Sequence, residues 1–135
     1  MRVLKGQSSM EFLAFVSISA LMLAAFHSVM VSKQGKAYEY QNSRAAGKVA
    51  EYVSFQAEMG LVQGDGYSRV FSIPERIGGE NYNLTLYNGT TQLQWSERST
   101  IRPNRYRGER IELQTSETNT FRVVNRGGEV DIVAQ

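Results

Sequence analysis

The strongest constraint on this chain is a run of twenty residues without a charged side chain, Phe12–Val31, close to its N-terminus. A helix rises ~1.5 Å per residue, so a segment of this length covers the ~30 Å hydrocarbon core of a bilayer. The flexible Gly6 lies before the apolar run, whereas an ordinary export signal has its cleavage site after the apolar core. A cut after Gly6 would therefore keep the apolar segment in the mature chain.

The charges around this segment predict its topology. Arg2 and Lys5 favour a cytoplasmic N-terminus, which leaves the C-terminal part of the chain outside. Glu11 stands at the edge of the apolar run, and a carboxylate costs at least ~2.5 kcal/mol at the centre of a bilayer. We therefore expect a partner for Glu11, and after a cut at Gly6 the new α-amino group of a neighbouring subunit's Gln7 would provide one.

The segment Lys5-Gly6-Gln7-Ser8-Ser9-Met10-Glu11-Phe12 resembles the class III (prepilin-type) signal peptide of archaeal type IV pilins, and the resemblance extends over about the first thirty residues. It implies a cleavage site formed by Lys5, Gly6 and Gln7, cut between the last two by a prepilin peptidase. It also implies an apolar helix that packs with identical subunits in the core of a surface filament, through a pilus assembly platform, with Glu11 contributing to assembly. Archaellins resemble the chain less, because they typically carry a glycine-rich stretch after the cut.

The composition agrees with an exported subunit that consists of one small domain and a tail. The chain has 135 residues and no cysteine, so no disulfide stabilises it. Its formal charge of +2 includes Arg2 and Lys5, and without them 13 basic residues face 13 acidic ones. A nucleic-acid-binding role is therefore not favoured by the net charge.

A second helical pattern follows the apolar segment. Gly35 lies in the polar stretch after it, where we expect a bend or a frayed turn, and Gly60 is expected to end the helix near Met59. Small residues in the apolar half favour close packing between helices: Ala14, Ser17, Ser19, Ala20, Ala24, Ala25 and Ser28. The expected apolar stripe of the second half comprises Ala37, Tyr40, Ala45, Val49, Tyr52, Val53, Gln56 and Met59.

From Tyr67 onward the pattern changes to the two-residue period of strands. Asn88-Gly89 suits a type I′ hairpin turn, and Gly127-Gly128 suggests a second hairpin. Counting outward from the first turn pairs Tyr87 with Thr90, Leu86 with Thr91, Leu84 with Leu93, and Tyr82 with Trp95. Counting outward from the second pairs Arg126 with Glu129, Asn125 with Val130, Val123 with Ile132, and Phe121 with Ala134.

Two further strands are predicted at 68–73 and 109–115, which makes about six antiparallel strands. The expected fold class is α+β, with a long N-terminal helix packed on one face of a small antiparallel β-sheet, as in type IV pilins. The expected parts are a cleaved leader at 1–6, a long helix at 7–60 with its apolar span at about 12–31, and a β headpiece at 67–135.

Two acceptor sequons for N-glycosylation lie in the headpiece, Asn83-Leu84-Thr85 and Asn88-Gly89-Thr90. Asn83 is expected on the polar face of its strand, and Asn88 at the tip of its hairpin. Asn-Gly-Thr is also a sequence that a tight turn favours, so the turn alone explains Asn88 equally well.

The densest basic run comprises Arg98, Arg102, Arg105, Arg107 and Arg110. Such a run offers a contact for a polyanion, because phosphate or anionic glycan binding is mostly Coulombic. The commoner explanation is a solvated loop or a polar contact between subunits, and Pro103 and Gly108 favour a loop.

Nothing in the sequence indicates a metal, a cofactor or a catalytic centre. The single histidine, His27, lies in the apolar run, and Glu11 is sixteen residues away, which is ~24 Å along a helix. We expect His27 to bond to a neighbouring helix instead. A catalytic triad would need this same histidine, so the chain is not expected to be an enzyme.

The sequence therefore predicts a structural pilin subunit: a precursor in the cytoplasmic membrane, and a mature protein in an extracellular filament that serves surface adhesion. One alternative is a membrane-tethered extracytoplasmic binding module with the same topology. The other is a minor pilin at the filament tip, which the sequence does not separate from a major one.

Overall fold

The structure is a computed structural model that describes residues 4–135, with side chains from Ser9 onward. The chain divides into two compact units, the first ending at Glu39 and the second comprising Tyr40–Gln135. Residues 1–3 of the predicted leader lie outside the described residues, and so do the side chains of Lys5 and Gln7 at the predicted cleavage site.

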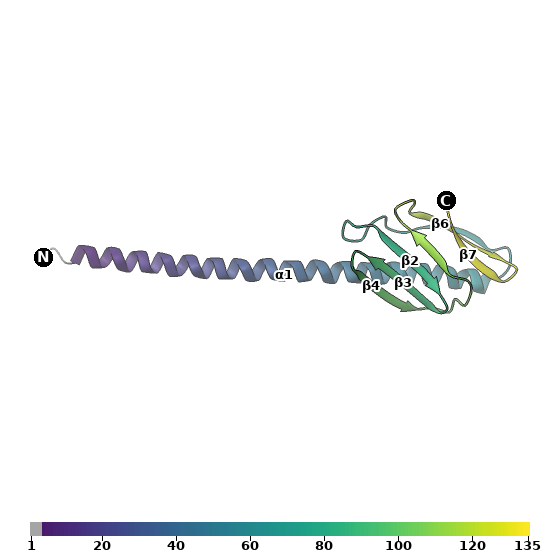
Figure 1. Cartoon of the computed structure of the whole chain (residues 1–135), viewed down its shortest axis with the longest axis horizontal. Coiled ribbons are helices and arrows are strands. Elements are labelled where there is room, and N and C mark those ends of the chain that lie inside the picture. The colour runs from purple at the N-terminus through teal and green to yellow at the C-terminus, as the bar shows by residue number, and fades with distance from the viewer. Residues whose placement is uncertain (1–3) are drawn as a thin grey trace. The chain divides into compact units, whose positions relative to one another are not determined.

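One helix, α1, runs from Leu4 to Gln63 and contributes to both units (Figure 1). The frayed turn expected at Gly35 is wrong, since the residues around it are helical. The end expected at Met59 is also wrong, because Gly60 is an interior helical residue packed against β-strand valines. The helix ends where Gly64 and Gly66 take φ values of 80° and 84°, a region that glycine adopts without strain.

The second unit contains seven strands: β1 (Ser68–Ser72), β2 (Tyr82–Tyr87), β3 (Thr90–Trp95), β4 (Arg98–Pro103), β5 (Ile111–Gln114), β6 (Thr120–Arg126) and β7 (Glu129–Ala134). They form two antiparallel sheets, β1-β6-β7 and β4-β3-β2-β5, and Figure 1 shows β2, β3 and β4 side by side. The α+β class is confirmed. The expectation of a single sheet of about six strands is wrong, because β4 was not predicted and β5 and β7 do not pair.

Both predicted hairpin registers are confirmed in every pair. Asn88 and Gly89 have φ values of 41° and 83°, and Gly127 and Gly128 have 65° and 92°. Positive φ at both central residues is what a type I′ turn requires, and the two-residue loop then fixes the strand register.

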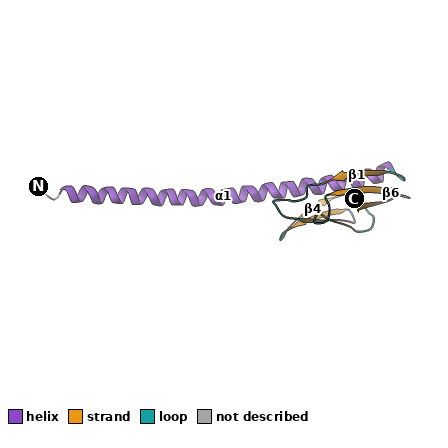
Figure 2. Ribbon diagram, turned by 90° about the horizontal axis from the view of Figure 1, so that it is seen from above, coloured by secondary structure: helices purple, strands orange, loops and turns teal. Residues whose placement is uncertain are grey.

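The core of the second unit lies between the helix and the inner faces of the sheets (Figure 2). Val49, Val53 and Gln56 are buried as predicted, but Tyr40, Ala45 and Tyr52 are exposed. The true buried face is rotated from the predicted one and uses small residues, namely Ala46, Gly47, Ala50, Ser54, Ala57 and Gly60. Small side chains let the sheets approach the helix closely, so the larger aromatic side chains are left on its outer side.

A buried polar chain links the helix to the second sheet. Ser54 Oγ lies 2.6 Å from Thr91 Oγ1, and Asn104 Nδ2 donates to Thr91 Oγ1 at 2.6 Å. The Asn104 Oδ1 atom in turn accepts the backbone N–H of Tyr106 at 3.0 Å. Each hydroxyl or amide in this chain has a partner, so its burial avoids the cost of an unpaired polar group.

Strand β4 forms one edge of the four-stranded sheet. The two-residue turn between β3 and β4 makes Trp95 and Arg98 a hydrogen-bonded closing pair. Hydrogen-bonded and non-hydrogen-bonded pairs alternate along the strand, so the backbone nitrogens of Ser99, Ile101 and Pro103 point away from β3. Proline has no N–H, and its place here agrees with the confinement of proline to the outer side of edge strands.

Candidate functional site

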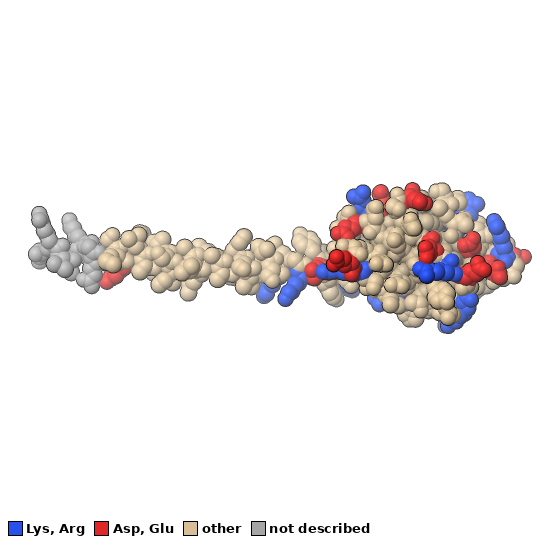
Figure 3. Space-filling view, in the orientation of Figure 1, with Lys and Arg blue, Asp and Glu red and all other residues tan. Residues whose placement is uncertain are grey.

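The apolar segment Phe12–Val31 lies within α1, and almost all of its side chains are exposed. Phe12 is 66% exposed, Phe15 71% and Leu21 71%. Figure 3 shows this part of the helix as a surface without charged residues. By length and composition, the described part of α1 from Ser9 to Gln63 qualifies as a membrane-spanning helix, and none of its most apolar window is buried. So large an apolar surface requires lipid or other protein around it.

Charged side chains stand at both ends of this segment. Glu11 precedes it, and Lys33 and Lys36 follow it, all three exposed. Ser17 and Ser28 lie within the segment, and Ser17 Oγ donates to the carbonyl oxygen of Leu13 at 2.8 Å, which satisfies its hydroxyl within the helix. The site therefore consists of an uncharged helix surface with an acidic and a basic end.

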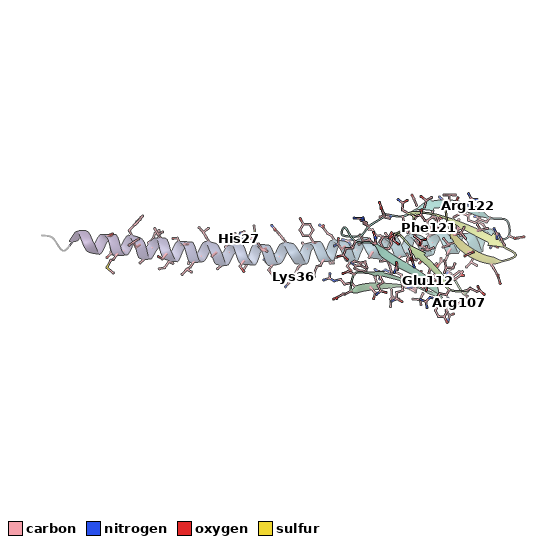
Figure 4. All side chains as sticks on the ribbon, turned by 45° about the horizontal axis from the view of Figure 1, so that its top comes forward. His27, Lys36, Arg107, Glu112, Phe121 and Arg122 are labelled. Atoms are coloured by element: carbon pink, nitrogen blue, oxygen red, sulfur yellow. The ribbon has the colours of Figure 1, made fainter. Side chains whose placement is uncertain are left out.

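His27 projects from this surface, as Figure 4 shows. It lines a shallow hollow on the helix together with Leu23, Phe26, Met30, Val31 and Gln34. No group of three or more metal-ligating side chains occurs among the described residues. The prediction that His27 bonds to a neighbouring helix requires a second copy to test it.

The five arginines of the basic run do not form one patch. Arg102 lies over the helix, with Nη2 2.7 Å from the place that a Cβ on Gly47 would occupy. Arg107 Nη1 donates to the carbonyl oxygens of Asn104 and Tyr106 at 3.2 and 3.1 Å.

Arg110 Nε pairs with Glu112 Oε1 at 2.7 Å. The loop expected for the whole run is wrong for its first part, since Arg98 and Arg102 belong to strand β4. Alternation along that strand and cross-strand pairing with β3 explain why these two side chains share the face of the core residues Trp95 and Thr91.

Both sequon asparagines are exposed. Asn83 lies in β2 on the face opposite the buried Leu84, and Asn88 occupies the hairpin tip. The tip is held by the loop after β4, because Gly89 N donates to Tyr106 O at 2.6 Å and Asn104 N donates to Gly89 O at 2.8 Å. A glycan on either asparagine would project into solvent without displacing core residues.

Sequence reasoning missed a groove between α1 and the edge strand β4. It has a volume of about 630 Å³, and its lining includes Tyr52, Phe55, Glu58, Arg102 and Pro103. Phe55 is 52% exposed on the helix side of this groove. One signal for it was Tyr52, which the predicted apolar stripe assigned to the core, and the other was Phe55, which lies outside that stripe.

Two buried tyrosines carry the shifted pKa values of the headpiece. Burial raises the pKa of Tyr82, whose hydroxyl donates to the carbonyl oxygen of Pro74. Burial also raises the pKa of Tyr106, and the carboxylates of Asp131, Glu109 and Glu129 add to this. The Tyr106 hydroxyl is shared between the carbonyl oxygens of Glu109 at 2.7 Å and Val130 at 3.2 Å. Both phenols act as neutral donors that fix loops to strands.

No protein-family model, curated protein or solved structure matches this chain.

Proposed function

We propose that this chain is the structural subunit of an archaeal type IV pilus-like surface filament, inserted in the membrane as a precursor and assembled through its N-terminal helix. The observation that carries the proposal is the exposed, uncharged surface of Phe12–Val31 with Glu11 at its start. A fold with one long apolar N-terminal helix and an antiparallel headpiece is compatible with a pilin.

The physical basis of assembly would be an exchange of neighbours around the helix. In the membrane, lipid surrounds Phe12–Val31, and in a filament identical helices would replace the lipid. The exposed surface of this segment is uncharged on all sides and mostly apolar, so several neighbouring helices can bury it. Glu11 would then require a cationic partner, because an unpaired carboxylate in an apolar bundle is strongly destabilising.

The proposed maturation is a cut between Gly6 and Gln7 by a prepilin peptidase, which removes Arg2 and Lys5 and leaves the uncharged segment near the new N-terminus. The headpiece would stay outside the membrane and form the filament surface. Its exposed Asn83 and Asn88 are the proposed attachment points for glycans, and its outer surface is the part available for adhesion.

A membrane-tethered binding module is the second candidate, favoured by the groove beside β4. Its volume of about 630 Å³ and its mixture of aromatic and charged side chains suit a small ligand. In that case the same helix would serve as an anchor for a monomer.

The test is intact-mass and N-terminal analysis of the protein in filaments sheared from its native host. We expect a chain that starts at Gln7, or its cyclised form, with added mass mapping to Asn83 or Asn88 where glycans are present. Absence of the chain from sheared filaments, with the protein retained in the membrane fraction, would contradict the filament proposal and favour the tethered module.

A further inference from the structure

The N-terminal unit separates its charges by a fixed distance. Along the described helix, Glu11 is followed by 21 residues without Asp, Glu, Lys or Arg, and then by Lys33 and Lys36. A rise of ~1.5 Å per residue places Glu11 about 33 Å from Lys33 and about 37 Å from Lys36. Within the described part of the chain none of these three side chains has a charged partner. A pair between them within one copy is excluded by that distance.

We propose that Glu11 of one subunit pairs with Lys33 and Lys36 of a second copy of this chain, displaced by about 33–37 Å along a shared axis. This inference rests on the proposed function, because it requires parallel helices of identical subunits. Lys33 and Lys36 are three residues apart and therefore lie on the same face of the helix. One carboxylate can contact both ammonium groups.

The displacement equals the length of the uncharged segment, which is the second reason for choosing it. The apolar surface of the first copy, which carries the paired Glu11, then begins at the level where that of the second copy ends, and Glu11 meets the lysines at this junction. A displacement that brought Glu11 of the first copy beside His27 of the second would instead place the second copy's Lys33 and Lys36 level with Ser17 and Ala20 of the first. There the two ammonium groups would enter an apolar surface without a carboxylate beside them.

This contact is compatible with a bond between Glu11 and a free α-amino group at Gln7 of another neighbour. A carboxylate has two oxygens and about four lone-pair sites, so it can accept from two neighbouring subunits. The two contacts belong to different neighbours, because the α-amino group requires an offset of only four residues, about 6 Å.

The test is zero-length coupling of carboxylates to amines in wild-type filaments, with an apolar carbodiimide and peptide mass spectrometry. We expect amide links from Glu11 to Lys33 or Lys36. Such a link must join two subunits, because the two side chains of one chain are too far apart to react with each other. The matched control is Lys33→Arg with Lys36→Arg, which keeps both charges but removes the amines. The filaments that it forms should yield no such link, while their other Glu–Lys pairs still couple.

A charge exchange provides a second, reagent-free measurement. Glu11→Lys alone is expected to reduce filaments in the sheared fraction at least tenfold, and adding Lys33→Glu with Lys36→Glu should restore most of them. Two results together would overturn the pairing and leave the proposed function intact. In the first, filaments couple other Glu–Lys pairs but not Glu11 with Lys33 or Lys36; in the second, the charge exchange restores no filaments. Absence of the wild-type chain from sheared filaments would overturn the proposed function itself.

Discussion

Asn125 Nδ2 donates a buried hydrogen bond of 2.8 Å to the carbonyl oxygen of Gly60, sixty-five residues earlier in the chain. The Oδ1 atom of Asn125 accepts the backbone N–H of Gly128 at 2.9 Å. One amide therefore ties the last turns of α1 to the hairpin between β6 and β7. Its position fixes where the helix ends relative to the three-stranded sheet.

Asn125→Ala is expected to destabilise the protein, because it leaves the Gly60 carbonyl and the Gly128 N–H without their partner. The unsatisfied buried carbonyl of Gly60 costs about 1–3 kcal/mol, whereas the N–H of the exposed Gly128 can bond to water instead. Denaturant unfolding of the detergent-solubilised full chain, followed through the headpiece, measures the effect. Asn81→Ala removes an exposed amide and should change the unfolding free energy little. Equal effects from both variants would show that the Asn125 bonds contribute nothing specific.

Alanine at two glycines of the same helix should have opposite effects. A Cβ at Gly35 meets nothing within 4 Å, so Gly35→Ala should stabilise the helix by up to ~1 kcal/mol through propensity alone. A Cβ at Gly60 would lie 3.1 Å from Cγ2 of both Val123 and Val130, which are buried and would have to shift to make room for it. Overpacking costs about 1–3 kcal/mol, so Gly60→Ala should destabilise despite the gain in propensity.

Thermal unfolding of the two alanine variants, monitored by circular dichroism, shows whether each substitution raises or lowers the stability. A rise in stability at both positions would mean that the valines have room to yield and that Gly60 is not required for close packing. The comparison is well matched, because both variants make the same chemical change in the same element.

Stability should fall as the pH rises above about 10, the ordinary pKa of tyrosine. The pKa values of Tyr82 and Tyr106 are raised in the folded state, so the unfolded chain loses these protons first. The unfolded state then binds fewer protons than the native state, which makes the slope of unfolding free energy against pH negative. The contribution is fully present below about pH 10 and is lost as the pH rises toward the folded-state pKa values.

Tyr82→Phe and Tyr106→Phe should each reduce this alkaline slope, measured by denaturant titration at a series of pH values. Each variant also loses a hydrogen bond, so its stability at neutral pH should fall by about 1 kcal/mol. Tyr87→Phe removes an exposed phenol and controls for the loss of a hydroxyl. An unchanged alkaline slope in both buried variants would contradict the linkage.

Glu11→Gln tests the role of the charge before the apolar segment. The change keeps the shape of the side chain but removes the ion pair, so filaments should become several-fold scarcer while membrane insertion stays normal. Electron microscopy of cells and the amount of protein in the membrane fraction are the two readouts. Glu51→Gln removes another exposed helical carboxylate, outside the segment, and should leave piliation unchanged. Normal piliation by Glu11→Gln would contradict the requirement for a pair.

The local signals in the sequence predicted most of the headpiece. Asn88-Gly89 and Gly127-Gly128 determine both their turns and their registers, because two-residue loops with positive φ leave no freedom in strand pairing. The apolar segment and Glu11 could also be recognised, since the length of an uncharged run is read directly from the sequence and compared with the hydrocarbon thickness.

Tertiary packing decided what the sequence could not show. Tyr40 and Tyr52 follow the expected helical spacing, yet Ala46 and Ala50 are buried instead. The sheets can approach the helix closely only on the face that carries its smallest side chains. Strand β4 was missed because its exposed arginines and Pro103 lack the apolar alternation of a half-buried strand. The groove between β4 and the helix could not be foreseen without that strand.

The nitrogen of Pro103 on the outer side of β4 limits how headpieces can meet. Headpieces packed closely in the proposed filament would risk joining edge to edge, since an open strand edge is a template for another strand. At Pro103 the backbone has no N–H to donate to such a strand, and Arg98 and Arg102 add two charged side chains to β4. In the proposed filament, this proline would keep neighbouring headpieces from forming a continuous sheet through β4, which would leave lateral order to the helices.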